Sequence, residues 1–100
     1  MSTILDRALT ERAWMRVVVE YAHLRGWGCY HTHDARHSVA GFPDLVLVRG
    51  TRLLFAELKR PGAHLTAAQT TWLADLGRVP GVAVAVWRPD DFEEVQRALA

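Results

Sequence analysis

The sequence predicts a small α/β/α sandwich, and two features of its hydrophobic pattern lead to this prediction. Two neighbouring strands, expected at 44–49 and 52–59, are apolar on both alternating faces, which indicates a sheet covered by helices on both sides. Helix-like and strand-like segments also follow one another in the order α-β-β-β-α-β-α. The 100 residues, half of them hydrophobic and 23% charged, suffice for a single domain spanning 1–100.

The first helix is expected from Thr10 to about Arg25. Thr10 is suited to cap its N-terminus, apolar residues then recur at helical spacing, and Gly26 ends the helix. A strand is expected at 27–33, where side chains alternate in character, and a polar loop follows at 34–41.

The second half of the chain alternates helix, strand and helix. Thr66 and Gln69 have the capping-box pattern, which predicts a helix to about Gly77. The almost purely apolar run at 82–87 predicts a buried strand, reached through a parallel crossover. A last helix is expected to start at Pro89.

Composition excludes several classes of protein. Cys29 is the only cysteine, which rules out an internal disulfide framework and a four-cysteine zinc site. No apolar run approaches the ~20 residues that a membrane span needs, and the first residues do not resemble a secretory signal, so we expect a cytoplasmic protein. The net charge of +1 means that any nucleic-acid binding must come from a local arrangement of charges.

The two central strands are predicted to form a hairpin that brings acidic groups together. Gly50-Thr51 is a two-residue connection with glycine first, as in a type II′ turn. Pairing outward from this turn places Asp44 opposite Glu57, with their Cβ atoms about 5 Å apart on one side of the sheet. Lys59, the only lysine, lies two residues beyond Glu57 and hence on the same side.

Two opposed carboxylates require compensation. At ~5 Å they repel by about 3 kcal/mol for an effective dielectric constant of ~20, so a shared proton, Lys59 or a divalent cation must offset the charge. Oxygen-only ligands suit Mg²⁺ or Mn²⁺, and a cation held by carboxylates beside a lysine is suited to phosphodiester hydrolysis. The alternative is an ordinary ion pair between Glu57 and Lys59 at a strand end, with Asp44 as a turn residue after Pro43.

These residues also carry a family resemblance. Pro43-Asp44 followed by Glu57-Leu58-Lys59 at a strand end resembles the active-site motif of the PD-(D/E)XK nuclease superfamily, which has the restriction-endonuclease-like fold. A wider set of segments between about Glu11 and Leu99 resembles the VRR-NUC family of that superfamily. These segments are Gly26-Trp27, Tyr30-His31-Thr32, Gly41-Phe42-Pro43-Asp44-Leu45-Val46-Leu47-Val48, Glu57-Leu58-Lys59, Leu65-Thr66-x-x-Gln69-x-x-Trp72-Leu73 and Val86-Trp87-Arg88-Pro89. The family's αβββαβ core agrees with the order derived above, here followed by a C-terminal helix.

The resemblance implies a Mg²⁺- or Mn²⁺-dependent endonuclease that hydrolyses phosphodiester bonds in DNA. In such enzymes the residues that match Asp44 and Glu57 bind the metal, and the backbone carbonyl that matches Leu58 adds a ligand. The residue that matches Lys59 positions or activates water. A glutamate on the first helix often completes the site, and Glu11 is the match.

Two of the implied site residues have simpler explanations. Glu11 is also a favourable acidic residue at a helix start, and Glu20 is a competing carboxylate on the same helix. Gln69 matches a family position near the site, yet the capping box with Thr66 explains it without catalysis.

Basic residues near the expected site are candidate nucleic-acid contacts. Arg36, in the loop that leads to Asp44, and Arg60, next to Lys59, are candidates for binding phosphate, and His31 is a candidate for lining the substrate groove. Every helix is needed to cover the sheet, so no element remains to read the major groove, which favours recognition of nucleic-acid shape. Stand-alone family members are associated with branched DNA, including four-way junctions, in replication, repair and recombination. They often act as homodimers, like Holliday junction resolvases.

Other interpretations remain open at the level of sequence. Arg49 and Arg52 at the hairpin tip are either nucleic-acid contacts or solvated surface residues. His31, His33 and His37 are a possible zinc site, although histidine also contacts phosphate directly. The protein as a whole is alternatively a non-catalytic nucleic-acid-binding or assembly module of the same fold.

Overall fold

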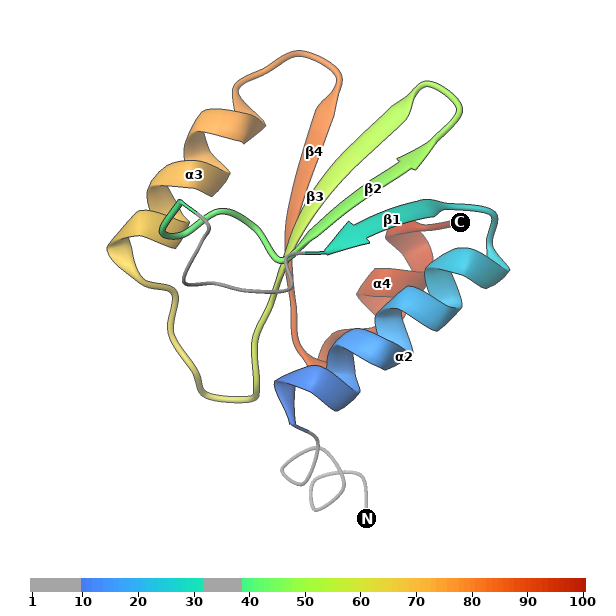
Figure 1. Ribbon diagram of the computed structural model, residues 1–100, viewed down its shortest axis with the longest axis horizontal. Coiled ribbons are helices and arrows are strands. Elements are labelled where there is room, and N and C mark those ends of the chain that lie inside the picture. Colours follow the sequence, from blue (N-terminus) through green and yellow to red (C-terminus); the bar gives the residue numbers. More distant parts are fainter. Residues whose placement is uncertain (1–9, 32–38) are drawn as a thin grey trace.

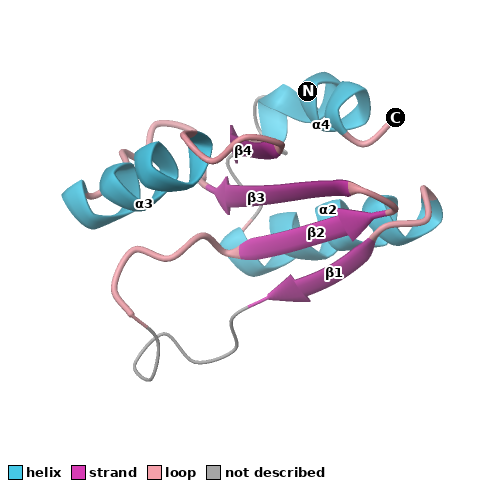
Figure 2. Cartoon of the chain, turned by 90° about the horizontal axis from the view of Figure 1, so that it is seen from above, coloured by secondary structure: helices cyan, strands magenta, loops and turns pink. Residues whose placement is uncertain are grey.

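The computed structural model describes residues 10–31 and 39–100, and the labels used from here are those of Figure 1. The elements follow the order expected from the sequence: α2 (Glu11–Leu24), β1 (Gly28–His31), β2 (Leu45–Arg49), β3 (Arg52–Leu58), α3 (Ala67–Gly77), β4 (Val82–Trp87), the 3-10 turn η2 (Pro89–Asp91) and α4 (Phe92–Ala98). The four strands form one sheet in the order β1-β2-β3-β4. The pairings are antiparallel except for β3 with β4, which run parallel, as Figure 2 shows.

The α/β/α sandwich is confirmed: α2 and α4 lie on one side of the sheet and α3 on the other (Figure 1). The core fills the space between the sheet, α2 and α4. Its buried apolar residues are Trp14, Val18, Ala22, Trp27, Leu45, Leu47, Leu54, Ala56, Leu58, Trp87, Val95 and Leu99. Two buried indole N–H groups form hydrogen bonds across this layer. Trp14 donates to the carbonyl of Trp87, and Trp27 donates to the carbonyl of Leu99, each at 3.0 Å.

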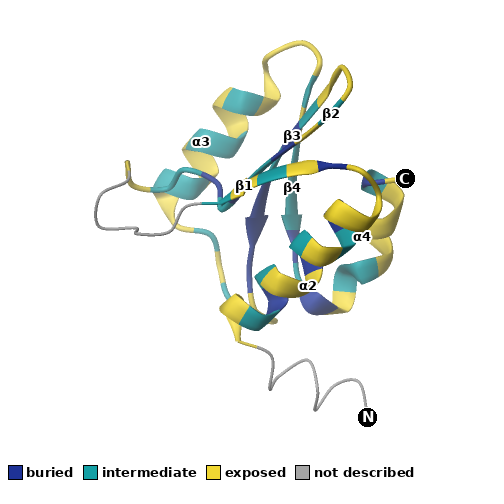
Figure 3. Cartoon of the chain, turned by 45° about the vertical axis from the view of Figure 1, so that its right-hand side comes forward, coloured by how far each residue is buried: buried dark blue, intermediate teal, exposed yellow. Residues whose placement is uncertain are grey.

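The opposite face of the sheet is covered less completely than the sequence predicted. None of the residues of α3 is buried, whereas α2 carries three buried residues (Figure 3). On the α3 side of β1 and β2, Tyr30 and Val48 remain 64% and 49% exposed. The expectation of a buried strand at 82–87 was also wrong. This strand, β4, lies at an edge of the sheet, and Trp87 is the only one of its residues that is buried.

The hairpin has the register expected from its turn. Arg49 pairs with Arg52, and the ladder continues without a bulge to Leu45 opposite Ala56. Gly50 has φ of +61°, whereas no residue other than glycine has a positive φ among those described. Positive φ at the first central position alone is what a type II′ turn requires.

Both predicted N-terminal helix caps are present, and three strand boundaries differ from expectation by one residue. β2 begins at Leu45 rather than 44, and β3 ends at Leu58 rather than 59. Thr10 accepts a hydrogen bond from the backbone of Ala13, and α3 begins with a complete capping box. The first strand begins at Gly28 rather than 27, because Trp27 packs into the core; residues 32–38 lie outside the described part. Within 10–31 and 39–100, no helix has the length and apolarity to cross a bilayer.

Candidate active site

Asp44 lies immediately before β2, at the end of a loop that packing holds in place. Pro43 is completely buried. The ring of Phe42 packs edge-to-face against Phe55 of β3 and Trp72 of α3, at centroid distances of 5.9 and 5.1 Å. Because these contacts anchor the two residues before it, Asp44 enters the sheet at a fixed position.

Gly41 allows this loop to approach α3 closely. Its φ is +84°, in the left-handed region, and a Cβ there would lie 2.5 Å from the carbonyl carbon of Ala68. Only glycine fits such a contact without displacement of the backbone. The first turn of α3 and the loop that carries Asp44 are therefore tightly coupled.

The structure brings Asp44 and Glu57 together at the ends of β2 and β3. Asp44 Oδ2 accepts a hydrogen bond of 2.8 Å from the backbone N–H of Leu58, which ties the aspartate to the end of β3. Glu57, one residue earlier in β3, is 2% exposed. The predicted approach of the two carboxyl groups is therefore present, although their roles in catalysis stay a prediction.

Glu57 is held in a site that disfavours its charge. Burial is the main reason why its pKa rises from 4.5 to about 8, followed by a hydrogen bond and like-charge repulsion from Asp44. Lys59 opposes the rise and Glu11 adds to it. A hydrogen bond between two carboxyl groups needs a proton. Among the residues that the structure describes, the buried Oε1 of Glu57 has no hydrogen-bond partner, so no donor stabilises a negative charge on that oxygen.

Lys59 lies at the end of β3, beside the acidic pair. Its residue is 9% exposed, and its backbone N–H donates to the carbonyl of Trp87 at 3.0 Å, which fixes its position against β4. Its positive charge favours the ionised form of Glu57. The location of the single lysine next to two carboxyl groups agrees with the arrangement expected from the hairpin.

Gln69 both caps α3 and contacts the site, two roles that the sequence suggested as alternatives. Its Oε1 accepts from the backbone N–H of Thr66 at 2.8 Å, which completes the capping box of α3. Its Nε2 donates to Glu57 Oε2 at 3.2 Å. One side chain thus caps the helix and contacts the acidic pair.

Glu11 approaches the site from the first turn of α2. It is exposed, and its charge is close enough to raise the pKa of Glu57. In the described part of the chain, however, no three His, Cys, Asp or Glu side chains are grouped closely enough to hold a metal ion. Glu11 is therefore not grouped with Asp44 and Glu57, and metal binding by any of the three stays a prediction.

The structure describes two of the three candidate nucleic-acid contacts. His31 ends β1 and pairs with Leu45, directly after Asp44. Arg60 is exposed and, with the three residues that follow, lines a shallow hollow next to Lys59. Arg36 lies outside the described residues.

The two arginines at the hairpin tip bind the chain itself. Arg49 donates to the carbonyl oxygens of Arg25, Leu99 and Ala100, and Arg52 to those of Ala98 and Ala100. Both guanidinium groups also lie over the ring of Trp27, at 4.9 and 4.8 Å from its centroid. They hold the end of α4 against the hairpin, so a structural role accounts for them.

Sequence reasoning missed one hollow beside the site. A groove between α2 and β1 is lined by Arg12, Met15, Arg16, Val19, Glu20 and His31. The signal was present, because Arg12 and Arg16 are four residues apart and therefore lie on one face of a helix.

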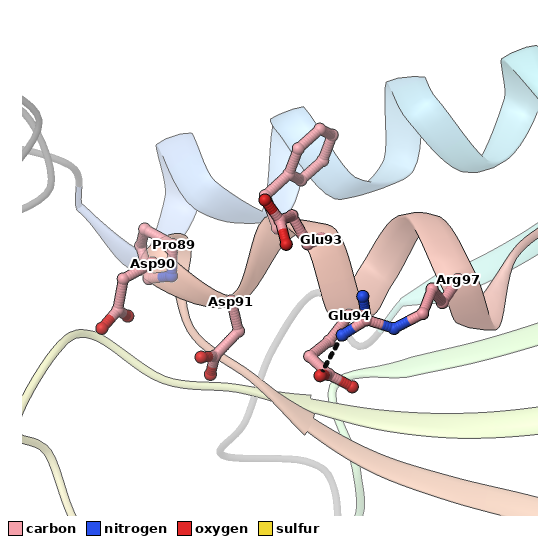
Figure 4. Close-up of a pocket in the computed structure, with 7 residues that line it drawn as sticks. Pro89, Asp90, Asp91, Glu93, Glu94 and Arg97 are labelled. Atoms are coloured by element: carbon pink, nitrogen blue, oxygen red, sulfur yellow. Dashed lines mark hydrogen bonds and ion pairs between the residues drawn. The ribbon is translucent and has the colours of Figure 1, made fainter.

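A larger hollow at η2 and α4 has the wrong charge for a phosphate. It measures about 470 Å³, and acidic residues dominate its lining (Figure 4). Its one basic residue, Arg97, is paired with Glu94. Repulsion between these carboxylates and a polyanion makes this hollow unsuited to nucleic acid.

Comparison with known proteins identifies the family. The model of the VRR-NUC domain matches residues 8–90. The chain belongs to the VRR-NUC domain family. A solved structure described as a VRR_NUC domain protein shares the fold, with a TM-score of 0.67 and 24% identity over 92% of this chain and 91% of the other. No curated protein matches. VRR-NUC membership implies a nuclease-type function and hence binding of nucleic acid.

Proposed function

We propose that this VRR-NUC protein is a Mg²⁺- or Mn²⁺-dependent endonuclease of the PD-(D/E)XK superfamily that hydrolyses phosphodiester bonds in DNA. The observation that carries the proposal is the acidic pair at the ends of β2 and β3, in which Glu57 is buried, with the only lysine beside it. A pair that costs stability when ionised is retained where function requires it.

The donor set fits a small hard cation. Asp44 and Glu57 offer carboxylate oxygens, which Mg²⁺ and Mn²⁺ prefer. The buried Glu57 Oε1 has no hydrogen-bond partner within 10–31 and 39–100, and a cation would satisfy it. We assign the cation to Asp44, Glu57 and the backbone carbonyl of Leu58, with Glu11 adding negative charge from α2.

Each residue of the site then has a defined task. When bound, the cation offsets charge on the phosphate and lowers the pKa of water. Lys59 presents its ammonium to the attacking water or to a non-bridging oxygen of the scissile phosphate. The Leu58 N–H holds Asp44, and Gln69 holds one oxygen of Glu57, so both carboxylates keep their orientation as the substrate binds.

We propose branched DNA, including four-way junctions, as the substrate class. The three helices of the described residues all pack against the sheet, which leaves none to enter a major groove and favours recognition of shape. Paired cuts at a junction require two active sites, so we also propose a homodimer. Tyr30 and Val48, exposed on the α3 side of β1 and β2, offer an apolar surface for such contact.

The test is cleavage of labelled four-way, flap and linear DNA by the purified protein with Mg²⁺, Mn²⁺, Zn²⁺ or chelator. We expect Asp44→Asn and Lys59→Met to lower the rate at least 100-fold while DNA binding is retained. Asp75→Asn is the matched control, because it removes an exposed carboxylate that is ion-paired with Arg78, away from the acidic pair. Full activity of both site variants refutes the proposal. Binding by the parent protein without cleavage under any condition favours a non-catalytic module.

A further inference from the structure

The groove between α2 and β1 has the composition of a binding site for a nucleotide strand. It encloses about 250 Å³. Its helical wall consists of Arg12, Met15, Arg16, Val19 and Glu20, whose spacing of three and four residues places them in one stripe of α2. The stripe has an apolar floor and two guanidinium groups along its length.

The two arginines of this stripe have no partner among the residues that the structure describes. Of the nine arginines in the described residues, five are hydrogen-bonded or ion-paired to the chain: Arg49, Arg52, Arg78, Arg88 and Arg97. Arg12 and Arg16 are exposed and form no hydrogen bond or ion pair within 10–31 and 39–100. Arginine is well suited to phosphate, because its planar fork offers two parallel donors.

The groove lies at the same end of the sheet as the acidic pair. Its strand wall is His31, which pairs with Leu45, the residue after Asp44. Its helical wall begins at Arg12, next to Glu11, whose charge acts on Glu57. A strand that passes over the acidic pair and continues across the edge of β1 therefore enters this groove.

We propose that this groove binds the DNA strand that is cut, with the phosphates beside the scissile bond held by Arg12 and Arg16. Met15 and Val19 contact the sugars or an unstacked base. Glu20 repels a further phosphate and so marks the distal end of the groove. The inference rests on the proposed nuclease function and adds the path of the strand to it.

The test measures affinity for four-way and single-stranded DNA by fluorescence anisotropy, with chelator and over a range of KCl concentrations. The Arg12→Ala/Arg16→Ala variant is compared with Arg25→Ala/Arg78→Ala, which removes equal charge from exposed positions at the C-terminal ends of α2 and α3. We expect the groove variant to bind at least 10-fold more weakly and to lose about 2 from the slope of log K against log[salt]. The control should change affinity less than about threefold.

Two further measurements separate this role from general charge and from folding. An Arg12→Lys/Arg16→Lys variant should recover the salt slope and part of the affinity. In cleavage assays with Mg²⁺, the Arg12→Ala/Arg16→Ala variant should raise KM while kcat changes less than about threefold. Equal affinities of the two alanine double variants overturn the proposed path and leave the nuclease proposal intact. Absence of DNA binding by the parent protein overturns both.

Discussion

The acidic pair makes stability depend on pH in a direction opposite to that of most carboxylates. Glu57 has a pKa of about 8 in the folded protein, against 4.5 for an ordinary glutamate. Between these two pH values, Glu57 keeps its proton in the folded protein but has lost it in the unfolded chain. The free energy of unfolding therefore falls as pH rises. The contribution is fully present below pH 4.5. Because each pKa unit corresponds to about 1.4 kcal/mol, up to about 5 kcal/mol is lost once the pH rises above 8.

Glu57→Gln removes this penalty while keeping the shape of the side chain. Without divalent cations, we expect the variant to exceed the parent in free energy of unfolding by about 2 to 4 kcal/mol at pH 8.5 and to match it near pH 4.5. Urea denaturation followed by tryptophan fluorescence measures both. Added Mn²⁺ should stabilise the parent at pH 8.5, because the cation offsets the negative charge of the ionised Glu57. It should not stabilise the variant, which has no carboxylate at this position.

Glu93→Gln, an exposed position on α4, is the control for the loss of a carboxylate. It should leave the free energy of unfolding within about 0.5 kcal/mol of the parent at both pH values. A parent protein as stable at pH 8.5 as at pH 4.5, or a Glu57→Gln variant less stable than the parent at pH 8.5, would refute the reasoning.

Three further substitutions test the parts that support the site. Gly41→Ala should cost about 2 to 4 kcal/mol in urea denaturation, because of its positive φ and its approach to α3; a neutral effect contradicts the close contact. Arg49→Ala with Arg52→Ala should cost about 1 to 3 kcal/mol and speed hydrogen exchange of the α4 amides, and unchanged exchange contradicts their anchoring role. Gln69→Glu keeps the capping pattern but sets another carboxylate against Glu57. DNA cleavage should fall at least 10-fold while the melting temperature changes by only a few degrees, and normal cleavage contradicts the contact.

The site was predictable from sequence wherever local geometry determines it. A two-residue turn fixes the register of the strands on either side, so Gly50-Thr51 was enough to bring Asp44 towards Glu57. Residue alternation along a strand then placed Lys59 beside them. Helix caps are equally local, which explains the agreement at Thr10.

The remaining features depend on contacts between distant segments, which a local pattern does not encode. An apolar run at 82–87 indicates a strand, but its place at the edge of the sheet follows from the crossover through α3. The role of Arg49 depends on where α4 ends, about fifty residues later. The second contact of Gln69 depends in the same way on how α3 packs against β3.

Anomalous scattering from crystals grown with Mn²⁺ shows whether Asp44 and Glu57 together hold a hard divalent cation. We expect a single strong peak within about 2.5 Å of an oxygen from each carboxylate, and its loss in crystals of Asp44→Asn. No peak at that position under saturating Mn²⁺, or a peak held by histidines instead, would contradict it.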